Sequence, residues 1–141
     1  MISGAFKDGA AEIEKIAKDS DSSSFAQLMD LKIVKAARGY ALAKLKISEE
    51  KHLNFRRGTH GAVLFAVADH ACGLCGNSLG RKAVLVHLSM NFFANPEIGS
   101  VIQAEANMIH EDEINGSMAI DVTTSDGKLL ARCQAIVYFL R

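Results

Sequence analysis

Residues 54–76 read NFRRGTHGAVLFAVADHACGLCG, and this stretch determines how the rest of the chain is interpreted. From His60 onward it combines small and large apolar side chains with a single acidic residue, Asp69. The pattern predicts an apolar helix over about 60–76, and a helix that is apolar on every side is expected to be buried on every side. A carboxylate in such surroundings loses hydration, so it must be paired, neutralised or used in chemistry.

The spacing between His60 and Asp69 indicates that more than one chain contributes to a site. Nine residues of helix rotate about 900° and rise roughly 13 Å, which places two side chains half a turn apart. We therefore expect these two residues to point to opposite sides of one helix. A site that holds both ends of the motif would need two copies of the chain.

The composition fits one domain of modest size with no overall charge preference. The chain has 141 residues, 49% of them hydrophobic, and 16 basic residues balance 16 acidic ones. This length supports a real core, and the balanced charge provides no field that favours nucleic acid or an anionic membrane. The longest apolar run is too short to span a bilayer, and the first residues lack a signal-peptide core. We expect a cytoplasmic protein with one domain over 1–141, in which 1–23 form an N-terminal helix and linker.

Three cysteines suggest a reducing compartment rather than a disulfide framework. Cys72 and Cys75 form a CxxC pair, and Cys133 is the third. A zinc site would need two further ligands at suitable spacing, and a redox pair usually lies at the start of a helix rather than near its end. We interpret all three as packing residues and expect no metal.

Hydrophobic periodicity predicts helices before the apolar helix and strands on both sides of it. A helix is expected over 3–18, where Phe6 begins an apolar face, and the Ser- and Asp-rich stretch after it caps a short helix at about 24–30. The predicted strands are 31–36 and 39–47, joined at Arg38-Gly39, and then 82–93, 100–110, 117–125 and 128–140. Asn115-Gly116 and Asp126-Gly127 are hairpin signals between the last three strands, so we expect an antiparallel meander.

Together these parts resemble the hotdog fold, an α+β fold in which a curved antiparallel sheet of five to six strands wraps around a central buried helix. Asn54, Gly58, His60-Gly61 and Asp69 resemble the motif Asn-x3-Gly-x-His-Gly-Gly-x6-Asp of the PaaI-like branch of acyl-CoA thioesterases, which is named after the phenylacetate degradation pathway. The segments MNFFANPEIG and SVIQAEA are similar to that family's strand, turn and next strand. The likeness covers roughly residues 25–140.

The resemblance implies a homodimer whose sheets pair edge to edge, with each active site between the subunits, and two dimers commonly form a homotetramer. In this chain the backbone N–H of Gly61, at a helix N-terminus, would donate to the thioester carbonyl. Asn54 would lie near the same oxygen or hold the loop around His60, which would itself contact substrate or serve as the helix N-cap. Asp69 of the other chain would act as a nucleophile, giving a mixed anhydride, or as a general base on water.

Some positions depart from the family motif or are only candidates. The second glycine of the motif is Ala62 here, which would narrow the acyl pocket. The family uses a Ser or Thr from a neighbouring strand to orient water, and Ser89 is our candidate. Arg56 and Arg81 are candidates for contact with the phosphates of coenzyme A, because guanidinium matches phosphate geometry. His70 points about 100° away from the preceding acid on a helix, which favours a packing or interface role.

The resemblance therefore implies an enzyme that hydrolyses an aromatic or medium-chain acyl-CoA to the free acid and coenzyme A, without a separate cofactor. Two alternatives stay open: a non-catalytic acyl-CoA-binding protein, and a hydratase or dehydratase of hydroxyacyl thioesters. The dehydratase would need a second acid beside His60, and a sensor would be supported by a DNA-binding segment; we find neither in the sequence. The acyl group is not specified, because apolar pockets discriminate between substrates by only about 1–3 kcal/mol per methylene.

Overall fold

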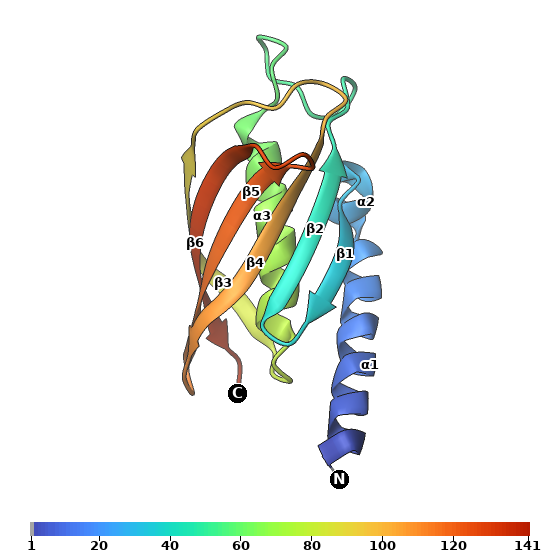
Figure 1. Ribbon diagram of the computed structural model, residues 1–141, viewed down its shortest axis with the longest axis vertical. Coiled ribbons are helices and arrows are strands. Elements are labelled where there is room, and N and C mark those ends of the chain that lie inside the picture. Colours follow the sequence, from blue (N-terminus) through green and yellow to red (C-terminus); the bar gives the residue numbers. More distant parts are fainter. Residues whose placement is uncertain (1) are drawn as a thin grey trace.

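One antiparallel sheet with a long helix packed against one of its faces makes up most of the molecule (Figure 1). The computed structural model describes the backbone of residues 2–141 and the side chains of residues 9–141. The helices are α1 (Ile2–Asp21), α2 (Ser24–Met29) and α3 (Gly61–Asn77). The strands are β1 (Lys32–Ala37), β2 (Tyr40–Lys46), β3 (Ala83–Phe92), β4 (Val101–Glu111), β5 (Asn115–Thr124) and β6 (Leu129–Phe139). The predicted α+β hotdog arrangement is confirmed, with six strands in the sheet.

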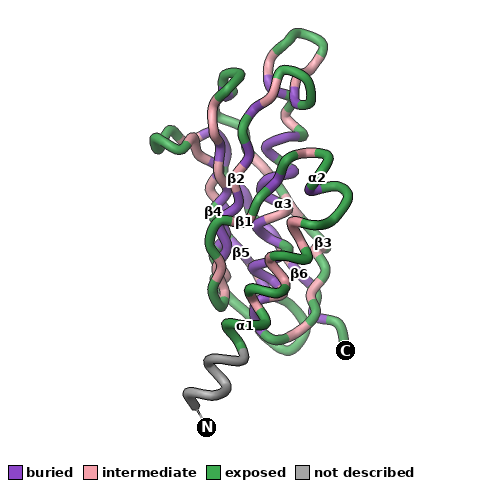
Figure 2. The backbone as a smooth tube through the Cα atoms, turned by 90° about the vertical axis from the view of Figure 1, so that its right-hand side faces the viewer, coloured by how far each residue is buried: buried purple, intermediate pink, exposed green. Residues whose placement is uncertain are grey.

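The core lies between α3 and the strands that face it, as the distribution of buried residues in Figure 2 shows. Val67 and Leu74 on the helix are buried, as are Ile102 on β4 and Ile120 on β5. Small residues in the strands, such as Ala104, leave room for the helix to approach the sheet closely. Each fully buried Val, Leu or Ile side chain contributes about 1.5–3 kcal/mol, so this layer carries much of the stability of the fold.

One face of α3 is not covered by the rest of the chain. Ala62, Phe65, Asp69 and Gly73 are exposed, and the last three recur every four residues along one stripe of the helix. Phe65 keeps 38% of its surface exposed. The expectation that this apolar helix is buried on every side is therefore wrong for the single chain, because the sheet and α1 together leave one stripe open.

The strand order differs from the predicted meander. The strands lie in the order β1-β2-β4-β5-β6-β3, so only β4, β5 and β6 form a meander. β3 pairs with β6, from Ala83 opposite Phe139 to Phe92 opposite Ala131, and forms one edge of the sheet. The loop after β3 crosses to the other side of the sheet, and the next strand, β4, pairs with β2.

Two of the three turn predictions need correction or refinement. Arg38-Gly39 is the predicted two-residue turn, and Gly39 has the positive φ of 73° that suits glycine. Asn115-Gly116 is not a loop, because both residues already pair in β5. The turn before them is built by Asp112, whose carboxylate accepts hydrogen bonds from the backbone N–H groups of Ile114 and Asn115. Asp126-Gly127 lies within a longer loop, with Gly127 at a φ of 100°.

The helices before the sheet follow the predicted pattern. α1 begins and ends a little beyond the predicted 3–18, and Phe6 lies outside the described side chains. Ser23 caps α2, since its side chain accepts a hydrogen bond from the backbone N–H of Ala26 at 3.3 Å. Asp30 ends α2 in a left-handed conformation with φ 61°. Within the described part of the chain, no helix combines the length and apolar character needed to cross a membrane.

Candidate active site

The start of α3 is prepared by a tight turn in the preceding loop. The side-chain oxygen of Asn54 accepts hydrogen bonds from the backbone N–H groups of Arg56 (2.9 Å) and Gly58 (3.0 Å), and its own N–H donates to the Gly58 carbonyl at 2.8 Å. Arg57 adopts a positive φ of 64° inside this turn. Asn54 therefore orders the loop, which is one of the two roles expected for it, and it does not line the groove described below.

His60 is the N-cap of α3. Its backbone is extended, with φ −66° and ψ 132°, and its ring Nδ1 accepts a hydrogen bond from the backbone N–H of Ala62 at 3.0 Å. The carbonyl of His60 accepts a further bond from Val63 at 2.9 Å. The N–H groups of the two residues after Gly61 therefore both have acceptors on His60. Of the two roles expected for His60, substrate contact and helix N-cap, this geometry fits the N-cap.

The backbone N–H of Gly61 points out of the first turn without an acceptor among the described residues. Gly61 is the first residue of α3, and the initial N–H groups of a helix have no partner inside it. The helix dipole adds positive potential at this end, so the amide is suited to a carbonyl oxygen on which negative charge develops. The Phe92 ring lies 3.5 Å from the position that a Cβ on Gly61 would occupy, which places an aromatic wall beside the amide.

An open groove of about 610 Å³ runs along the exposed face of α3. The groove is lined by apolar side chains and one carboxylate, with contributions from α2, α3 and β3: Phe25, Gly61, Ala62, Phe65, Ala66, Asp69 and Phe92. The expected position of Asp69 in a fully buried environment is wrong, because its side chain is exposed toward this groove. The protein packed beneath the carboxylate nevertheless desolvates it enough to raise the pKa of Asp69 above its ordinary value, and the neighbouring His70 partly offsets that shift.

Gly61 and Asp69 lie on the same face of the helix, so the half-turn argument made for His60 and Asp69 does not describe this pair. The half-turn argument used His60, but that residue is an extended N-cap and the helical rotation does not apply to it. Gly61, Phe65 and Asp69 are four residues apart and line one groove. Because eight residues of helix rise about 12 Å, the amide and the carboxylate of one chain remain well separated along that groove.

His70 packs away from the groove, as its direction on the helix predicted. Its Nε2 lies 3.0 Å from Oδ1 of Asp21, and its side chain is only 9% exposed. The same Asp21 carboxylate accepts hydrogen bonds from the backbone N–H of Ile33 at 2.9 and 3.1 Å. This contact joins the end of α1 to α3 and β1, so His70 has a structural role.

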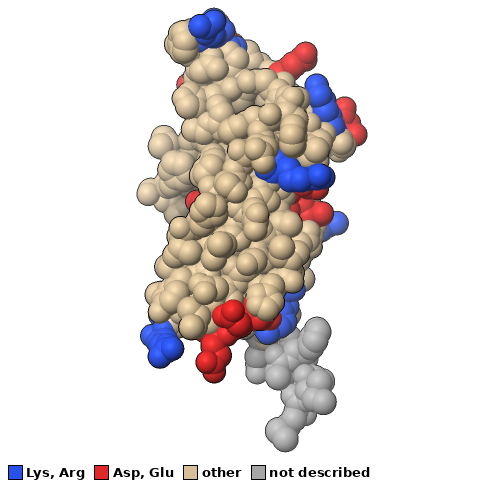
Figure 3. Space-filling view, turned by 90° about the vertical axis from the view of Figure 1, so that its left-hand side faces the viewer, with Lys and Arg blue, Asp and Glu red and all other residues tan. Residues whose placement is uncertain are grey.

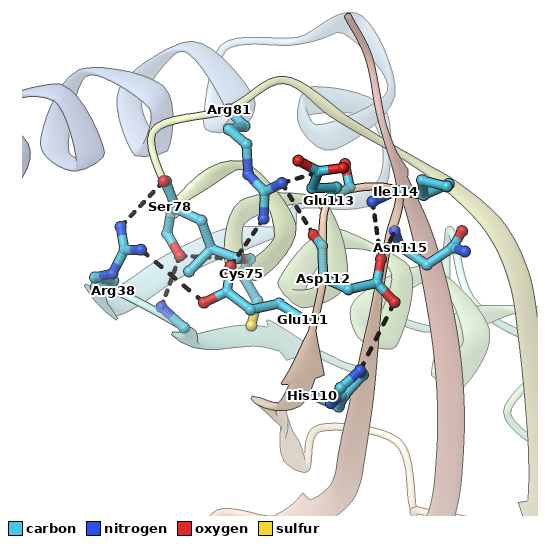
Figure 4. A network of polar contacts seen from close by, with 12 residues as sticks. Arg38, Cys75, Ser78, Arg81, His110, Glu111, Asp112, Glu113, Ile114 and Asn115 are labelled. Atoms are coloured by element: carbon cyan, nitrogen blue, oxygen red, sulfur yellow. Dashed lines mark hydrogen bonds and ion pairs between the residues drawn. The ribbon is translucent and has the colours of Figure 1, made fainter.

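Three other predicted site residues lie outside the groove. Ser89 is exposed on β3, opposite Gln134 of β6. The Arg56 guanidinium lies 5.0 Å from the centre of the Phe55 ring in the loop before α3. Arg81 lies beyond the other end of α3, where it donates to the Glu111 carboxylate at 2.8 Å (Figure 4). Its guanidinium also stacks 3.6 Å from the centre of the Phe139 ring. These contacts hold Arg81 in a polar network at the sheet end and give no support to a phosphate role.

Sequence reasoning missed several residues that build this site. The Asn95 side chain exchanges two hydrogen bonds with the backbone of Thr59, at 3.2 and 3.0 Å, and the Thr59 hydroxyl donates to the Pro96 carbonyl at 2.8 Å. These bonds fasten the loop before α3 to the loop after β3. Asn95-Pro96 follows the predicted strand 82–93, and no local pattern reveals a partner 36 residues away. Phe25 and Phe92 also went unassigned because apolar periodicity does not distinguish a groove wall from the core.

The cysteines pack in the interior, as predicted. Cys72, Cys75 and Cys133 are free and buried. Burial raises the pKa of Cys75 and of Cys133 to about 12 and shifts that of Cys72 upward as well. Among the described side chains, no group of three His, Cys, Asp or Glu residues is arranged to hold a metal ion.

Comparisons with known proteins find similar sequences and a matching family. The family model described as Thioesterase superfamily matches residues 58–131. A protein named as an esterase from Archaeoglobus fulgidus is 30% identical over 112 residues, which cover 79% of this chain and 72% of that protein. The acyl-coenzyme A thioesterase PaaI of Escherichia coli is 24% identical over 111 residues, which cover 79% of each chain.

Solved structures share the fold. The structure of the E. coli PaaI protein matches with a TM-score of 0.87 at 20% identity over 96% of both chains. A hypothetical thioesterase of Streptococcus pneumoniae, solved with coenzyme A, matches with a TM-score of 0.79 at 22% identity, over 87% of this chain and 95% of that one.

Proposed function

This chain belongs to the thioesterase superfamily, and we propose that it is an acyl-CoA thioesterase whose active sites lie across the interface of a homodimer. Membership of the family makes it a thioester hydrolase. The E. coli relative supports acyl-CoA as the substrate class, as does the coenzyme A held by the Streptococcus protein. The observation that carries the proposal is the groove on α3, which contains an unpaired helix-start amide and a carboxylate.

The distance between these two groups is the reason for invoking a second chain. Gly61 and Asp69 of one chain are separated by about 12 Å of helix, whereas both must reach the same thioester carbonyl. A twofold axis perpendicular to α3 would make the helices of two chains antiparallel and would bring each Gly61 opposite the other chain's Asp69. Phe65 lies four residues from both, so that axis would pass close to it.

The exposed edge of the sheet supports the same pairing. β3 is an edge strand of ten residues that contains no Lys, Arg, Asp or Glu, and Val84, Val86 and Phe92 on it are exposed. Figure 3 shows that the charged side chains on this side of the molecule lie mostly at the rim of a wide uncharged area. A long, apolar, unpaired edge is a template for another strand, and soluble proteins normally cover such an edge. Pairing of two β3 strands would cover it.

The groups in the shared site can perform the hydrolysis without a separate cofactor. The Gly61 N–H would hydrogen-bond the thioester oxygen and stabilise the charge that develops on it. Asp69 of the other chain would attack the carbonyl carbon, the C–S bond would break, and coenzyme A would leave as a thiolate that takes a proton. Water would then hydrolyse the mixed anhydride. Alternatively, Asp69 would remove a proton from the attacking water; the raised pKa makes this carboxylate a stronger base than an ordinary aspartate.

Replacing Gly61 by proline tests the amide without disturbing the helix. Proline is well tolerated at the first helical position, and the extended backbone of His60 suits a residue before proline. Gly61→Pro removes the N–H and should lower kcat by about 10²–10³-fold. Gly61→Ala is the matched control, because it keeps the N–H and its Cβ would make only an ordinary contact with Phe92. Equal activity of the two variants would contradict the role of the amide.

Asp69→Asn tests the acid in the same assay, the release of free thiol from acyl-CoA. The variant keeps the size of the side chain, so the oligomer should stay intact while turnover falls at least about a hundredfold. Undiminished turnover would remove the mechanism.

Other predictions remain proposals. Arg56, which makes no ion pair among the described residues, is the remaining candidate for phosphate contact. The free buried thiols support a reducing compartment such as the cytoplasm. A homotetramer of two dimers is tested by the mass of the native protein in solution.

A further inference from the structure

We propose that Phe25 is a specificity-determining residue that forms one wall of the acyl-binding groove, and that His52 is the positioning residue that holds this wall. The inference rests on the proposed function, because it concerns the acyl group that the groove accepts. The inference assigns a role in substrate binding to α2, an element separate from α3 and from the sheet. The position of α2 would decide which acyl groups are hydrolysed well, whereas Gly61 and Asp69 would supply the chemistry.

The location of Phe25 is the first observation. Its side chain lines the same groove as Gly61 and Asp69, facing a space that Phe65 and Phe92 also border. Phe25 is 53% exposed although the next residue, Ala26, is 1% exposed and belongs to the core. Burial of Ala26 fixes the orientation of this short helix, so the phenyl ring is held over the groove. An aromatic ring in that position offers apolar contact to any acyl group long enough to reach it.

The second observation is the way in which α2 is held. His52 is 1% exposed, and both of its ring nitrogens have partners. Nδ1 accepts a hydrogen bond from the backbone N–H of Ser48 at 2.8 Å, so Nε2 carries the proton and donates to the carbonyl of Met29 at 3.0 Å. Met29 is the last residue of α2, and His52 therefore ties the end of that helix to the loop that leads to α3.

The same residue also contacts the start of α3 through its backbone. The carbonyl of His52 accepts a hydrogen bond from the N–H of His60 at 2.8 Å, one residue before Gly61. One buried residue thus fixes both the groove wall on α2 and the N-cap next to the reactive amide. A second tie is exposed, the ion pair between Lys51 and Asp30 at 2.9 Å, and it adds little because surface pairs are weak.

The wall is tested by comparing acyl groups of different size. Phe25→Ala should lower kcat/KM for hexanoyl-CoA and phenylacetyl-CoA by about tenfold or more, whereas acetyl-CoA, which is too short to reach the ring, should change less than about twofold. Leu28→Ala is the matched control: it removes an apolar side chain that is 66% exposed on the same helix and does not line the groove. An unchanged ratio between long and short substrates in Phe25→Ala would overturn the proposal. A ratio that rises would also overturn it, since Phe25 would then be an obstacle rather than a wall.

The role of His52 is tested with two variants that each keep one of its bonds. His52→Gln can still donate to the Met29 carbonyl, whereas His52→Asn can still accept from Ser48 but no longer reaches Met29. His52→Asn should shift the ratio of long to short substrates in the same direction as Phe25→Ala, and combining the two should add little further shift. His52→Gln should keep the wild-type ratio. A purely structural residue would lower the activity toward all three substrates equally, and that result would overturn the positioning role.

Failure of this inference can be distinguished from failure of the proposed function. If wild-type protein releases thiol and Asp69→Asn does not, the function holds whatever the Phe25 variants show. If the wild type and Asp69→Asn behave alike on all three substrates, the proposed function fails, and a binding assay with hexanoyl-CoA then tests whether Phe25→Ala weakens binding at least tenfold. Unchanged binding in that assay would overturn the wall as well.

Discussion

The role of His60 can be decided by measuring stability and activity on the same variants. The Nδ1 atom of His60 accepts a hydrogen bond from the N–H of Ala62 at 3.0 Å, and this is the side-chain cap of α3. Alanine at an N-cap costs about 0.5–2 kcal/mol, typically about 1 kcal/mol. For a chain of this size, His60→Ala should therefore lower Tm by about 2–6 °C.

The effect on catalysis follows from the same free energy. If His60 acts only by capping, its loss frays the first turn of α3 and displaces the Gly61 amide. The free-energy cost to catalysis is then no larger than the free energy that the cap contributes to the helix. A loss of about 1 kcal/mol corresponds to about a fivefold decrease in kcat/KM. A direct role in proton transfer would instead cost about 10²–10⁴-fold. The two interpretations differ by more than an order of magnitude in the thiol-release assay.

Asparagine at position 60 provides the control, because it is among the best N-cap residues and cannot act as an imidazole base. We expect His60→Asn to recover the wild-type Tm to within about 2 °C and the wild-type kcat/KM to within about threefold. A variant with wild-type Tm and a hundredfold loss of activity would refute the capping interpretation and would assign His60 a direct part in the reaction.

Three further predictions concern the groove, the core and the assembly. Partial burial raises the pKa of Asp69 above its ordinary value of 3.8, so protonation of this side chain favours the folded state. The stabilisation is complete below pH 3.8 and is lost as the pH rises through the pKa of the folded state. Asp69→Asn should consequently have a higher Tm than the wild type at pH 7 and no advantage in acid, and a pH-independent difference would contradict this. Gly76→Ala should lower the free energy of unfolding in urea by about 1–3 kcal/mol, because its Cβ would lie 3.2 Å from Val137 and 3.3 Å from Ala83. Gly73→Ala is the control and should not destabilise the fold, because a Cβ there meets open space. Equal effects of the two variants would refute the packing argument. Phe65→Cys should form an intersubunit disulfide under mild oxidation, seen as a dimer on non-reducing gels. Gly73→Cys should not form one, because only position 65 would lie next to the twofold axis. A Phe65→Cys protein that runs as a monomer on these gels would place the axis elsewhere.

Sequence periodicity was sufficient for the elements that alternate or repeat within a short window. The strands β4 to β6 and the helix α3 were predicted within a few residues of their bounds, because their inward positions carry Val, Ile, Leu, Ala or Cys at regular spacing. The turn at Arg38-Gly39 was also predicted, since a positive φ favours glycine. The position of β3 was not, because its alternation is equally compatible with pairing to β4 or to β6. Strand order depends on contacts between distant residues, such as Leu85 with Val137.

Of the candidate site residues, Gly61, Ala62 and Asp69 lie in one groove, but sequence reasoning did not predict how they are arranged. The family motif suggested Gly61 and Asp69 as the groups that act on the substrate, whereas the spacing argument treated His60 as part of the helix and placed His60 and Asp69 on opposite sides. An N-cap has extended backbone, so helical geometry begins only at the residue after it. Phe25, which also lines the groove, comes from a separate short helix, and the packing of Ala26 into the core brings it there.

The shared site is tested most directly by mixing two inactive proteins. Gly61→Pro lacks the amide and Asp69→Asn lacks the acid, so each homodimer has two defective sites. Random exchange of subunits yields about half heterodimers, and a twofold arrangement gives each of these one site with both groups intact and one with neither. The mixture should therefore recover about a quarter of wild-type thiol release per chain. Activity that stays at the level of the separate variants, with exchange confirmed by native mass spectrometry, would show that both groups act within one chain.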